Sequence, residues 1–207
     1  MAQTRRRSRR NRRKPKKSKR GIVIALIILV IIGVVGFIVV SNFGKAQRFI
    51  GSKLYPIKYS EYFDKASEEH GVKKELIYAM IRTESHFKKD AVSSAGAVGL
   101  MQLTPDTYEW LCRLRGIDYV DGGLYDPAIN IDFGTYLINY LYKEFDGDEK
   151  LMIAAYNAGP DNVKSWLKNP EYSADGKTLT NVPYEETEKH IDKVLDAEQK
   201  YKKLYFS

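Results

Sequence analysis

A carboxylate ends an apolar helical pattern at Glu84. The apolar residues before it fall on one helical face: Val72, Leu76, Ile77, Met80 and Ile81. Glu84 lies three positions after Ile81 and seven after Ile77, so its side chain points with theirs toward the core. Burial there raises a carboxyl pKa, which lets a glutamate donate a proton near neutral pH. The pattern alone favours the other interpretation, a glutamate at a frayed helix end that turns to solvent or pairs with Arg82 or a lysine.

The mechanism depends on whether a second carboxylate faces Glu84. Glycosidases that use two carboxylates place them on either side of the scissile bond. Glu75 is nine residues earlier, which turns it about 180° away on the same helix. Asp90 lies in the following loop, and Asp126 and Glu186 are remote in sequence. No pair is evident, although folding could bring one together.

A stretch of small residues follows Glu84, at residues 94–99 with the sequence SAGAVG. Because these side chains fill little space, the backbone can approach a ligand and offer its N–H and C=O groups. Gln102 then supplies an amide that both donates and accepts hydrogen bonds. Such groups suit the hydroxyl and N-acetyl groups of a sugar. A tight turn between two helices is the simpler interpretation of the stretch taken alone.

The elements that position these groups are expected to be helices. Thr104-Pro105-Asp106 has the order of an N-cap, a first helical residue and an acidic first turn, and Gly116 would close that helix. Asp175-Gly176 predicts a turn or a small hairpin within residues 172–182. Helical spacing or stop signals predict further helices over 72–81, 131–145, 151–156 and from 191 almost to the C-terminus. The fold class is therefore mainly α.

Two segments at the N-terminus differ from the rest of the chain. Residues 1–20 hold twelve of the 34 Lys and Arg and no Asp or Glu, which leaves 22 basic against 26 acidic side chains elsewhere. Residues 22–40 contain no polar side chain. A helix of that length spans roughly 28 Å, about the thickness of a bilayer core. A cleaved signal peptide has a shorter apolar region and a small-residue cleavage site, which 41–44 lacks, so an uncleaved anchor over 21–40 is expected.

The basic residues beside this segment predict its orientation. Lys and Arg next to a span stay on the cytoplasmic side, so the tail of residues 1–20 is expected inside the cell and the remaining chain outside. Anionic lipid head groups are then the expected partner of the tail. A basic run of this kind also suits nucleic acid, but beside a membrane span no nucleic-acid partner is expected.

The functional domain is expected over residues 57–207, after a short linker over 41–56. About 150 residues suffice for one hydrophobic core. Cys112 is the only cysteine, so no intrachain disulfide is possible and a core position is its expected role. Nothing in the sequence proposes a metal site or a cofactor.

Several ordered motifs of this domain resemble the soluble lytic transglycosylase family, which is related in fold to goose-type lysozyme. The motifs are Glu84-Ser85, then SAGAVGLMQLTP at 94–105, DPAINI at 126–131 with Gly134 and Tyr136-Leu137, AAYNAGP at 154–160 and VPYEET at 182–187. The resemblance covers about residues 60–195. It reverses the interpretation of Glu84, which matches the sole catalytic acid of the family.

The resemblance also implies roles for other residues. Tyr156 matches a tyrosine that hydrogen-bonds the acid and the reacting sugar, and Glu186 matches a glutamate that contacts substrate. His190 departs from the family, which usually has a tyrosine there; it is expected to pack as a helix residue or to change a hydrogen bond or the pH response, and not to be catalytic. The substrate-binding set is completed by Ser94, Gly96, Gly99, Met101, Gln102 and Asn157, of which the glycines shape the backbone, Asn157 supports its motif, and Met101 lines the groove or packs in the core.

The chemistry that the resemblance implies uses one acid. Glu84 would protonate the glycosidic oxygen between N-acetylmuramic acid and N-acetylglucosamine in bacterial peptidoglycan, then remove the proton of the sugar's 6-hydroxyl as a 1,6-anhydro ring closes. An intramolecular attack needs no second carboxylate. A hydrolase on the same fold and a catalytically silent peptidoglycan-binding protein are the alternatives. An extracellular domain tethered to the cell membrane would face the cell wall.

Overall fold

The structure is a computed structural model that describes residues 19–207, except for the side chains of residues 43 and 45–48. The chain divides into two units, Met1–Phe49 and Ile50–Ser207. The basic tail expected at residues 1–20 lies almost entirely outside the described residues. Its contacts with lipid therefore stay a prediction.

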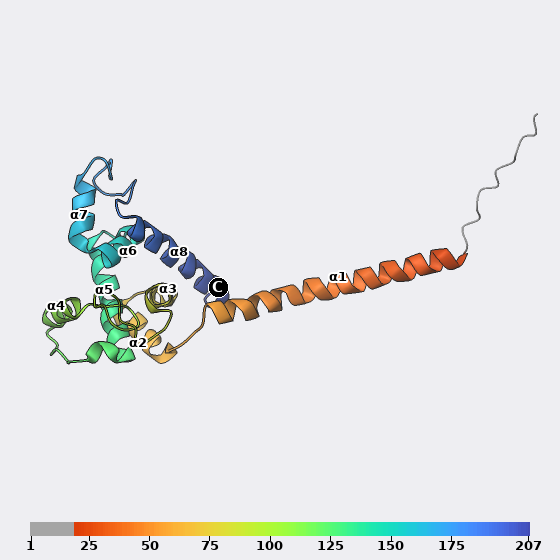
Figure 1. The fold of residues 1–207 in the computed structure, drawn as a ribbon, viewed down its shortest axis with the longest axis horizontal. Coiled ribbons are helices and arrows are strands. Elements are labelled where there is room, and N and C mark those ends of the chain that lie inside the picture. The colour runs from red at the N-terminus through yellow and green to blue at the C-terminus, as the bar shows by residue number, and fades with distance from the viewer. Residues whose placement is uncertain (1–18) are drawn as a thin grey trace, which may run out of the picture. The chain divides into compact units, whose positions relative to one another are not determined.

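Helix α1 runs over Lys19–Leu54 (Figure 1). Its segment Lys19–Asn42 has a mean hydropathy of 3.5 and is long and apolar enough to cross a membrane, judged by length and composition. The helix contains the span expected at 21–40 and continues through most of the linker expected at 41–56. Single glycines such as Gly44 and Gly51 weaken a helix by about 1 kcal/mol each but do not end it.

The unit Ile50–Ser207 is helical, as the sequence predicts, and no strand occurs among residues 19–207. Helix α8 packs against α3 and α6, while α5 packs against α2 and α6. In Figure 1, α8 runs from the side of α6 to the C-terminus. The helices after α1 are α2 (Ser60–His70), α3 (Lys74–Ser85), α4 (Pro105–Arg115), α5 (Pro127–Glu144), α6 (Glu149–Ala158), α7 (Pro160–Lys168) and α8 (Glu185–Tyr205), with the 3-10 helix η1 (Gly123–Tyr125).

The capping residues explain where several helices begin and end. The Thr104 side chain accepts a hydrogen bond from the backbone N–H of Thr107, and Gly116 closes α4 in the left-handed conformation, as predicted. Asp126 and Asp148 cap α5 and α6 in the same way. Because Asp126 is an N-cap, α5 begins four residues before the expected 131.

Two helices were not predicted, and one ambiguous segment is resolved. The unpredicted helices are α2, whose residues are mostly polar, and α7, which begins directly after Gly159. Of the two alternatives for residues 172–182, the structure has the turn. The Asp175 side chain accepts hydrogen bonds from the backbone N–H groups of Lys177 and Thr178. These local bonds satisfy the chain without a paired strand.

A buried amide fixes the loop between α3 and α4. Asn130 is fully buried in α5; its Nδ2 donates to the carbonyls of Val98 and Leu124, and its Oδ1 accepts from the N–H of Met101. Gly99 has a φ of +83°, and a Cβ there would lie 2.4 Å from the Leu124 carbonyl oxygen. Only glycine therefore fits. The loop is thus held rigidly beside the end of α3.

Candidate active site

Glu84 lies in the last turn of α3, and His86, in the left-handed conformation, caps the C-terminal end of this helix. Its side chain is 14 % exposed, so it faces inward as the periodicity predicts. Burial raises the pKa of Glu84 from 4.5 to about 8. Desolvation alone accounts for this shift, without a contribution from a neighbouring carboxylate among the described residues. The glutamate is therefore protonated at neutral pH.

A hydrogen bond joins the end of α3 to the small-residue loop. Ser85 is buried, and its hydroxyl lies 2.7 Å from the Leu100 carbonyl oxygen, to which it donates. The same hydroxyl is 3.2 Å from the carbonyl oxygen of Ile81, one turn earlier in α3. The position of Glu84 relative to the loop is thus set by its direct neighbour.

His190 of α8 faces Glu84 across the contact between α3 and α8. Its Nε2 lies 3.3 Å from Glu84 Oε1, and its side chain is 10 % exposed. The distance suits an ion pair, yet the angle does not give a hydrogen bond, and Nε2 has no other partner within the described part of the chain. Burial, and secondarily the charge of Lys193, lower the pKa of His190 from 6.5 to about 4. Both members of the pair are therefore uncharged at neutral pH.

Tyr156 completes the group from the last turn of α6. Its hydroxyl donates to the carbonyl oxygen of Met101 at 2.7 Å, and not to Glu84 as the resemblance implies. Burial and the nearby Glu84 charge raise the pKa of Tyr156 well above 10. The phenol stays neutral and ties α6 to the loop, so its proton is directed to the backbone in this structure.

Asn157 and Glu186 lie at the junction of α6 and α8. The Asn157 side chain accepts a hydrogen bond from the Thr187 hydroxyl at 2.7 Å, which holds the two helix ends together. This agrees with a supporting role for Asn157. Glu186 is exposed in the first turn of α8, where its charge favours the helix N-terminus and is free to meet a ligand.

The loop residues predicted to bind substrate separate into exposed and buried groups. Ser94 and Gly96 are exposed, whereas Gly99 is buried. The Met101 side chain is fully buried, so of its two expected places the structure has the core. Gln102 has a φ of +50°, and its Nε2 donates to the carbonyls of Gly99 and Ala91. These two donor bonds hold the loop, and the contact with a sugar expected of Gln102 stays a prediction.

A cleft of about 390 Å³ opens beside Tyr156. Aromatic side chains of α4 and α5, Trp110 and Tyr140, contribute to its wall and pack edge-to-face with ring centroids 5.3 Å apart. Lys164 and Glu144 form an ion pair in the same wall. Aromatic walls with a few polar groups are typical of small-molecule sites. Tyr156 lines this cleft, whereas Glu84 is not among its lining residues.

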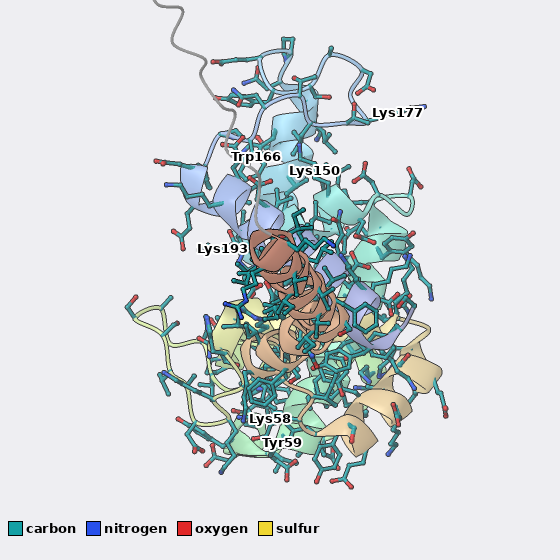
Figure 2. All side chains as sticks on the ribbon, turned by 90° about the vertical axis from the view of Figure 1, so that its right-hand side faces the viewer. Lys58, Tyr59, Lys150, Trp166, Lys177 and Lys193 are labelled. Atoms are coloured by element: carbon teal, nitrogen blue, oxygen red, sulfur yellow. The ribbon has the colours of Figure 1, made fainter. Side chains whose placement is uncertain are left out.

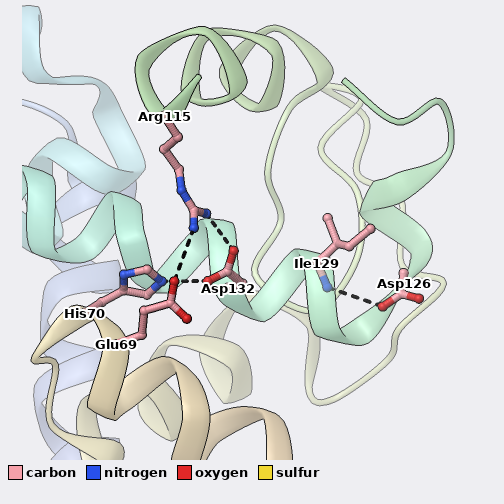
Figure 3. Close-up of polar contacts among 6 residues, drawn as sticks. All are labelled: Glu69, His70, Arg115, Asp126, Ile129 and Asp132. Carbon is pink, nitrogen blue, oxygen red and sulfur yellow. Dashed lines mark hydrogen bonds and ion pairs between the residues drawn. The ribbon is translucent and has the colours of Figure 1, made fainter. Parts of the chain in front are cut away.

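A second polar cluster lies away from Glu84 and contains the residue types of a metal site (Figure 3). Glu69 and His70 come from α2 and Asp132 from α5, and their ligand atoms lie within 4.8 Å of one another. Arg115 already supplies a cation, at 2.6 Å from Asp132 and 3.7 Å from Glu69. His70 Nε2 lies 2.6 Å from the other Asp132 oxygen. The donors are thus satisfied by an ion-pair network.

Comparison with known proteins identifies the family of this helical domain. Residues 61–179 match the family model of the transglycosylase SLT domain, and the chain belongs to this family. It is 31 % identical over 151 residues to the soluble lytic murein transglycosylase of Salmonella typhimurium, a match that covers 72 % of this chain and 23 % of the relative. It is also 31 % identical over 167 residues to the membrane-bound lytic murein transglycosylase C of Haemophilus influenzae, covering 70 % of this chain and 47 % of the relative.

Solved structures show the same fold. The 70 kDa soluble lytic transglycosylase of Escherichia coli superposes with a TM-score of 0.66 at 28 % identity, over 74 % of this chain and 25 % of that one. An inactive glutamate-to-glutamine mutant of the lytic transglycosylase Slt from Pseudomonas aeruginosa superposes with a TM-score of 0.63 at 30 % identity, over 72 % of this chain and 25 % of that one. The chain thus spans about a quarter of the length of these relatives.

Proposed function

We propose that this chain is a membrane-anchored peptidoglycan lytic transglycosylase. It cleaves the β-1,4 bond between N-acetylmuramic acid and N-acetylglucosamine and leaves 1,6-anhydro ends. The observation that carries the proposal is the buried Glu84, whose pKa of about 8 makes it a proton donor at neutral pH. Membership of the transglycosylase SLT family supports the substrate class.

The reaction begins with proton transfer from Glu84 to the glycosidic oxygen. As that bond breaks, the muramic-acid carbon gains positive charge, which the substrate's own N-acetyl group stabilises. Glu84, now a carboxylate, takes the proton of the 6-hydroxyl, whose oxygen attacks the same carbon. A pKa near neutrality suits a group that both gives and takes a proton. Because both reacting groups belong to one sugar, neither a second carboxylate nor an attacking water is needed.

The other predicted residues hold the substrate or the site. Tyr156 acts with Glu84 as a catalytic residue; it lines the cleft, and the charge of Glu84 acts on its phenol and helps to raise the pKa of that group. Glu186 contacts the glycan from the start of α8. Ser94 and Gly96 present the exposed edge of the loop, while Gly99, Met101, Gln102 and Asn157 keep the loop and helix ends in shape.

The anchor restricts where the enzyme acts. The apolar part of α1, residues 21–40, spans the membrane, with the basic residues 1–20 in the cytoplasm against anionic lipids. Residues 41–56 connect the anchor to the catalytic domain of residues 57–207 at the cell wall. Membrane-bound lytic murein transglycosylase C is a relative by sequence and supports an anchored arrangement. Glycan strands near the membrane would be the ones reached.

Mass spectrometry of digested peptidoglycan tests the proposal. The full chain, purified in detergent micelles, is incubated with isolated cell-wall sacculi, and the soluble products are weighed. Fragments with 1,6-anhydro-N-acetylmuramic acid ends, 18 mass units lighter than hydrolysis products because no water is added, support the transglycosylase. Reducing ends would assign a hydrolase instead. Release of no fragment, with retention of the protein on the sacculi, would assign a binding protein.

A further inference from the structure

The imidazole of His190 is held in place by its neighbours on α8. Thr187, one turn earlier, bonds to Asn157 of α6, and Ile191 and Val194 are buried in the core. The helix therefore cannot rotate without breaking both contacts, so the ring stays on the face that meets α3. Its Nε2 lies 3.3 Å from Glu84 Oε1 and is buried without a hydrogen bond among residues 19–207.

A buried imidazole nitrogen without a partner costs free energy, and one small rotation of the Glu84 carboxyl would remove that cost. Hydrogen bonds in catalytic sites are often long or poorly aligned before substrate binds, and they tighten in the complex. The ionisable groups around the ring are Glu84 of α3, which is protonated at neutral pH, and Lys193 of α8, an exposed and charged residue labelled in Figure 2. From α6, Tyr156 interacts with Glu84. Glu84 is thus the partner that the geometry offers.

We propose that His190 is a positioning residue for Glu84, whose Oε1 accepts a hydrogen bond from the Nε2–H of the neutral imidazole. This bond forms whether Glu84 is protonated or ionised, because Oε1 accepts in both states. It fixes the carboxyl rotamer and leaves Oε2 to carry the proton to and from the sugar. His190 itself neither gains nor loses a proton. The proposal rests on the proposed function for its kinetic consequences, but not for the contact itself.

The low pKa of the His190 imidazole explains why the ring stays neutral and its Nε2–H remains a donor. Burial lowers its pKa to about 4, so the imidazole does not take the Glu84 proton at neutral pH. A histidine that became charged beside Glu84 would instead stabilise the carboxylate and remove the proton donor. Desolvation of the ring thus leaves the proton on Glu84, while the Nε2–H bond holds the Glu84 carboxyl in one orientation.

Nuclear magnetic resonance tests the contact without any assay of cleavage. The chain has three histidines, so the full-length protein in micelles with ¹⁵N-labelled histidine gives few imidazole signals, which H70Q and H86Q variants assign. We expect His190 to be the tautomer protonated at Nε2, and its Nε2 signal to shift with a midpoint near the Glu84 pKa of about 8. In E84Q this shift disappears. A His190 signal that follows an ordinary histidine titration near pH 6.5 in both proteins would overturn the proposal.

Enzyme kinetics test the consequence, with soluble glycan strands as substrate. H190L removes the donor, and we expect kcat to fall roughly 10- to 100-fold, the usual effect of losing a hydrogen bond to a charged group, with KM little changed. H190Q keeps an N–H donor and should restore most of the loss. Equal kcat in H190L and the wild type, with matched circular dichroism melting curves, would contradict the positioning role. If the wild type cleaves nothing, the proposed function fails, and the resonance experiment still decides the contact.

Discussion

Two carboxyl–histidine pairs among residues 19–207 have opposite chemistry. At the α2–α5 contact, Asp132 lies 2.6 Å from His70 and 2.6 Å from Arg115. At the α3–α8 contact, Glu84 lies 3.3 Å from His190 with no such cation beside it. Burial raises the pKa of Asp132, but hydrogen bonds from His70 and Arg115 outweigh it and hold the pKa below 3.8. Burial of Glu84 meets no opposing contact, so its pKa rises to about 8.

The difference shows that residue type does not decide which pair is reactive. A carboxylate that is fully bonded and paired contributes to stability and stays ionised, whereas a buried carboxyl without a cation keeps a proton that it can give away. Arg115 is itself held by further contacts, because its guanidinium also lies 4.4 Å from the centre of the Phe133 ring. The Asp132 carboxylate is thus satisfied by a cation and a histidine, whereas the Glu84 carboxyl has no cation to offset its burial.

The strongest test exchanges each carboxyl for its amide. E84Q removes the proton donor, and we expect cleavage of peptidoglycan to fall roughly 10²- to 10⁴-fold, the contribution of general acid–base catalysis. D132N is the matched control: it weakens the ion-pair network, but the folded fraction should cleave at a rate close to the wild type. Release of soluble fragments per mole of folded protein is the measurement. Undiminished cleavage by E84Q would remove Glu84 from the mechanism.

The pH dependence of stability should have opposite signs at the two pairs. The folded pKa of Glu84 is raised from 4.5 to about 8, so its contribution is full below pH 4.5 and is lost as the pH rises through 8. At about 1.4 kcal/mol per pKa unit, E84Q should be more stable than the wild type above pH 8 by on the order of 5 kcal/mol.

For Asp132 the pKa is lowered, so its contribution is full above pH 3.8 and is lost as the pH falls through the folded value. The wild type should therefore have a larger free energy of unfolding than D132N at neutral pH, and this difference should disappear in acid. Urea unfolding of the full chain in micelles from pH 3 to 9 measures both differences. A parallel pH response of the two variants would show that the pairs do not differ as described.

Removing the cation should expose what Arg115 contributes. In R115M the partly buried Asp132, whose side chain is 29 % exposed, loses its charged partner. We expect a destabilisation of about 2 kcal/mol, less than for a fully buried pair because solvent screens part of the charge. R113M is the control from the same helix, since Arg113 pairs with Glu109 at the surface and such pairs contribute about 1 kcal/mol or less. Equal urea midpoints for the two variants would mean that the Arg115 network adds no stability.

Local periodicity predicted most of the helices, though not α2 or α7, and it placed Glu84 on the inward face of α3. The cap at Thr104 and the closing glycine at Gly116 were equally local signals. The contact between Glu84 and His190 joins residues 106 positions apart, so no pattern along the chain could reveal it. A partial signal existed: His190 shares a helical face with Ile191, Val194 and Thr187, and a polar residue on a buried face needs a partner. The hydrogen bonds of the Gln102 side chain depend on its left-handed backbone conformation, which cannot be predicted from a glutamine in the sequence.

The smallest effect concerns the cation that faces each histidine. Arg115 bonds the partner of His70, whereas Lys193 has no bond to Glu84 and acts on His190 by repulsion, as the lesser cause of its lowered pKa. K193M should therefore raise the pKa of His190 only slightly toward the ordinary value of 6.5, because burial of the ring remains.

Added salt should raise the pKa of His190 by the same amount in the wild type and not at all in K193M, since exposed charges are screened over about 10 Å at 0.1 M. K189M is the control, because Lys189 pairs with Glu185 on the same helix. Titration of the His190 imidazole signals measures all three, and a rise in K189M as large as in K193M would show that general charge, not the neighbouring lysine, tunes the ring.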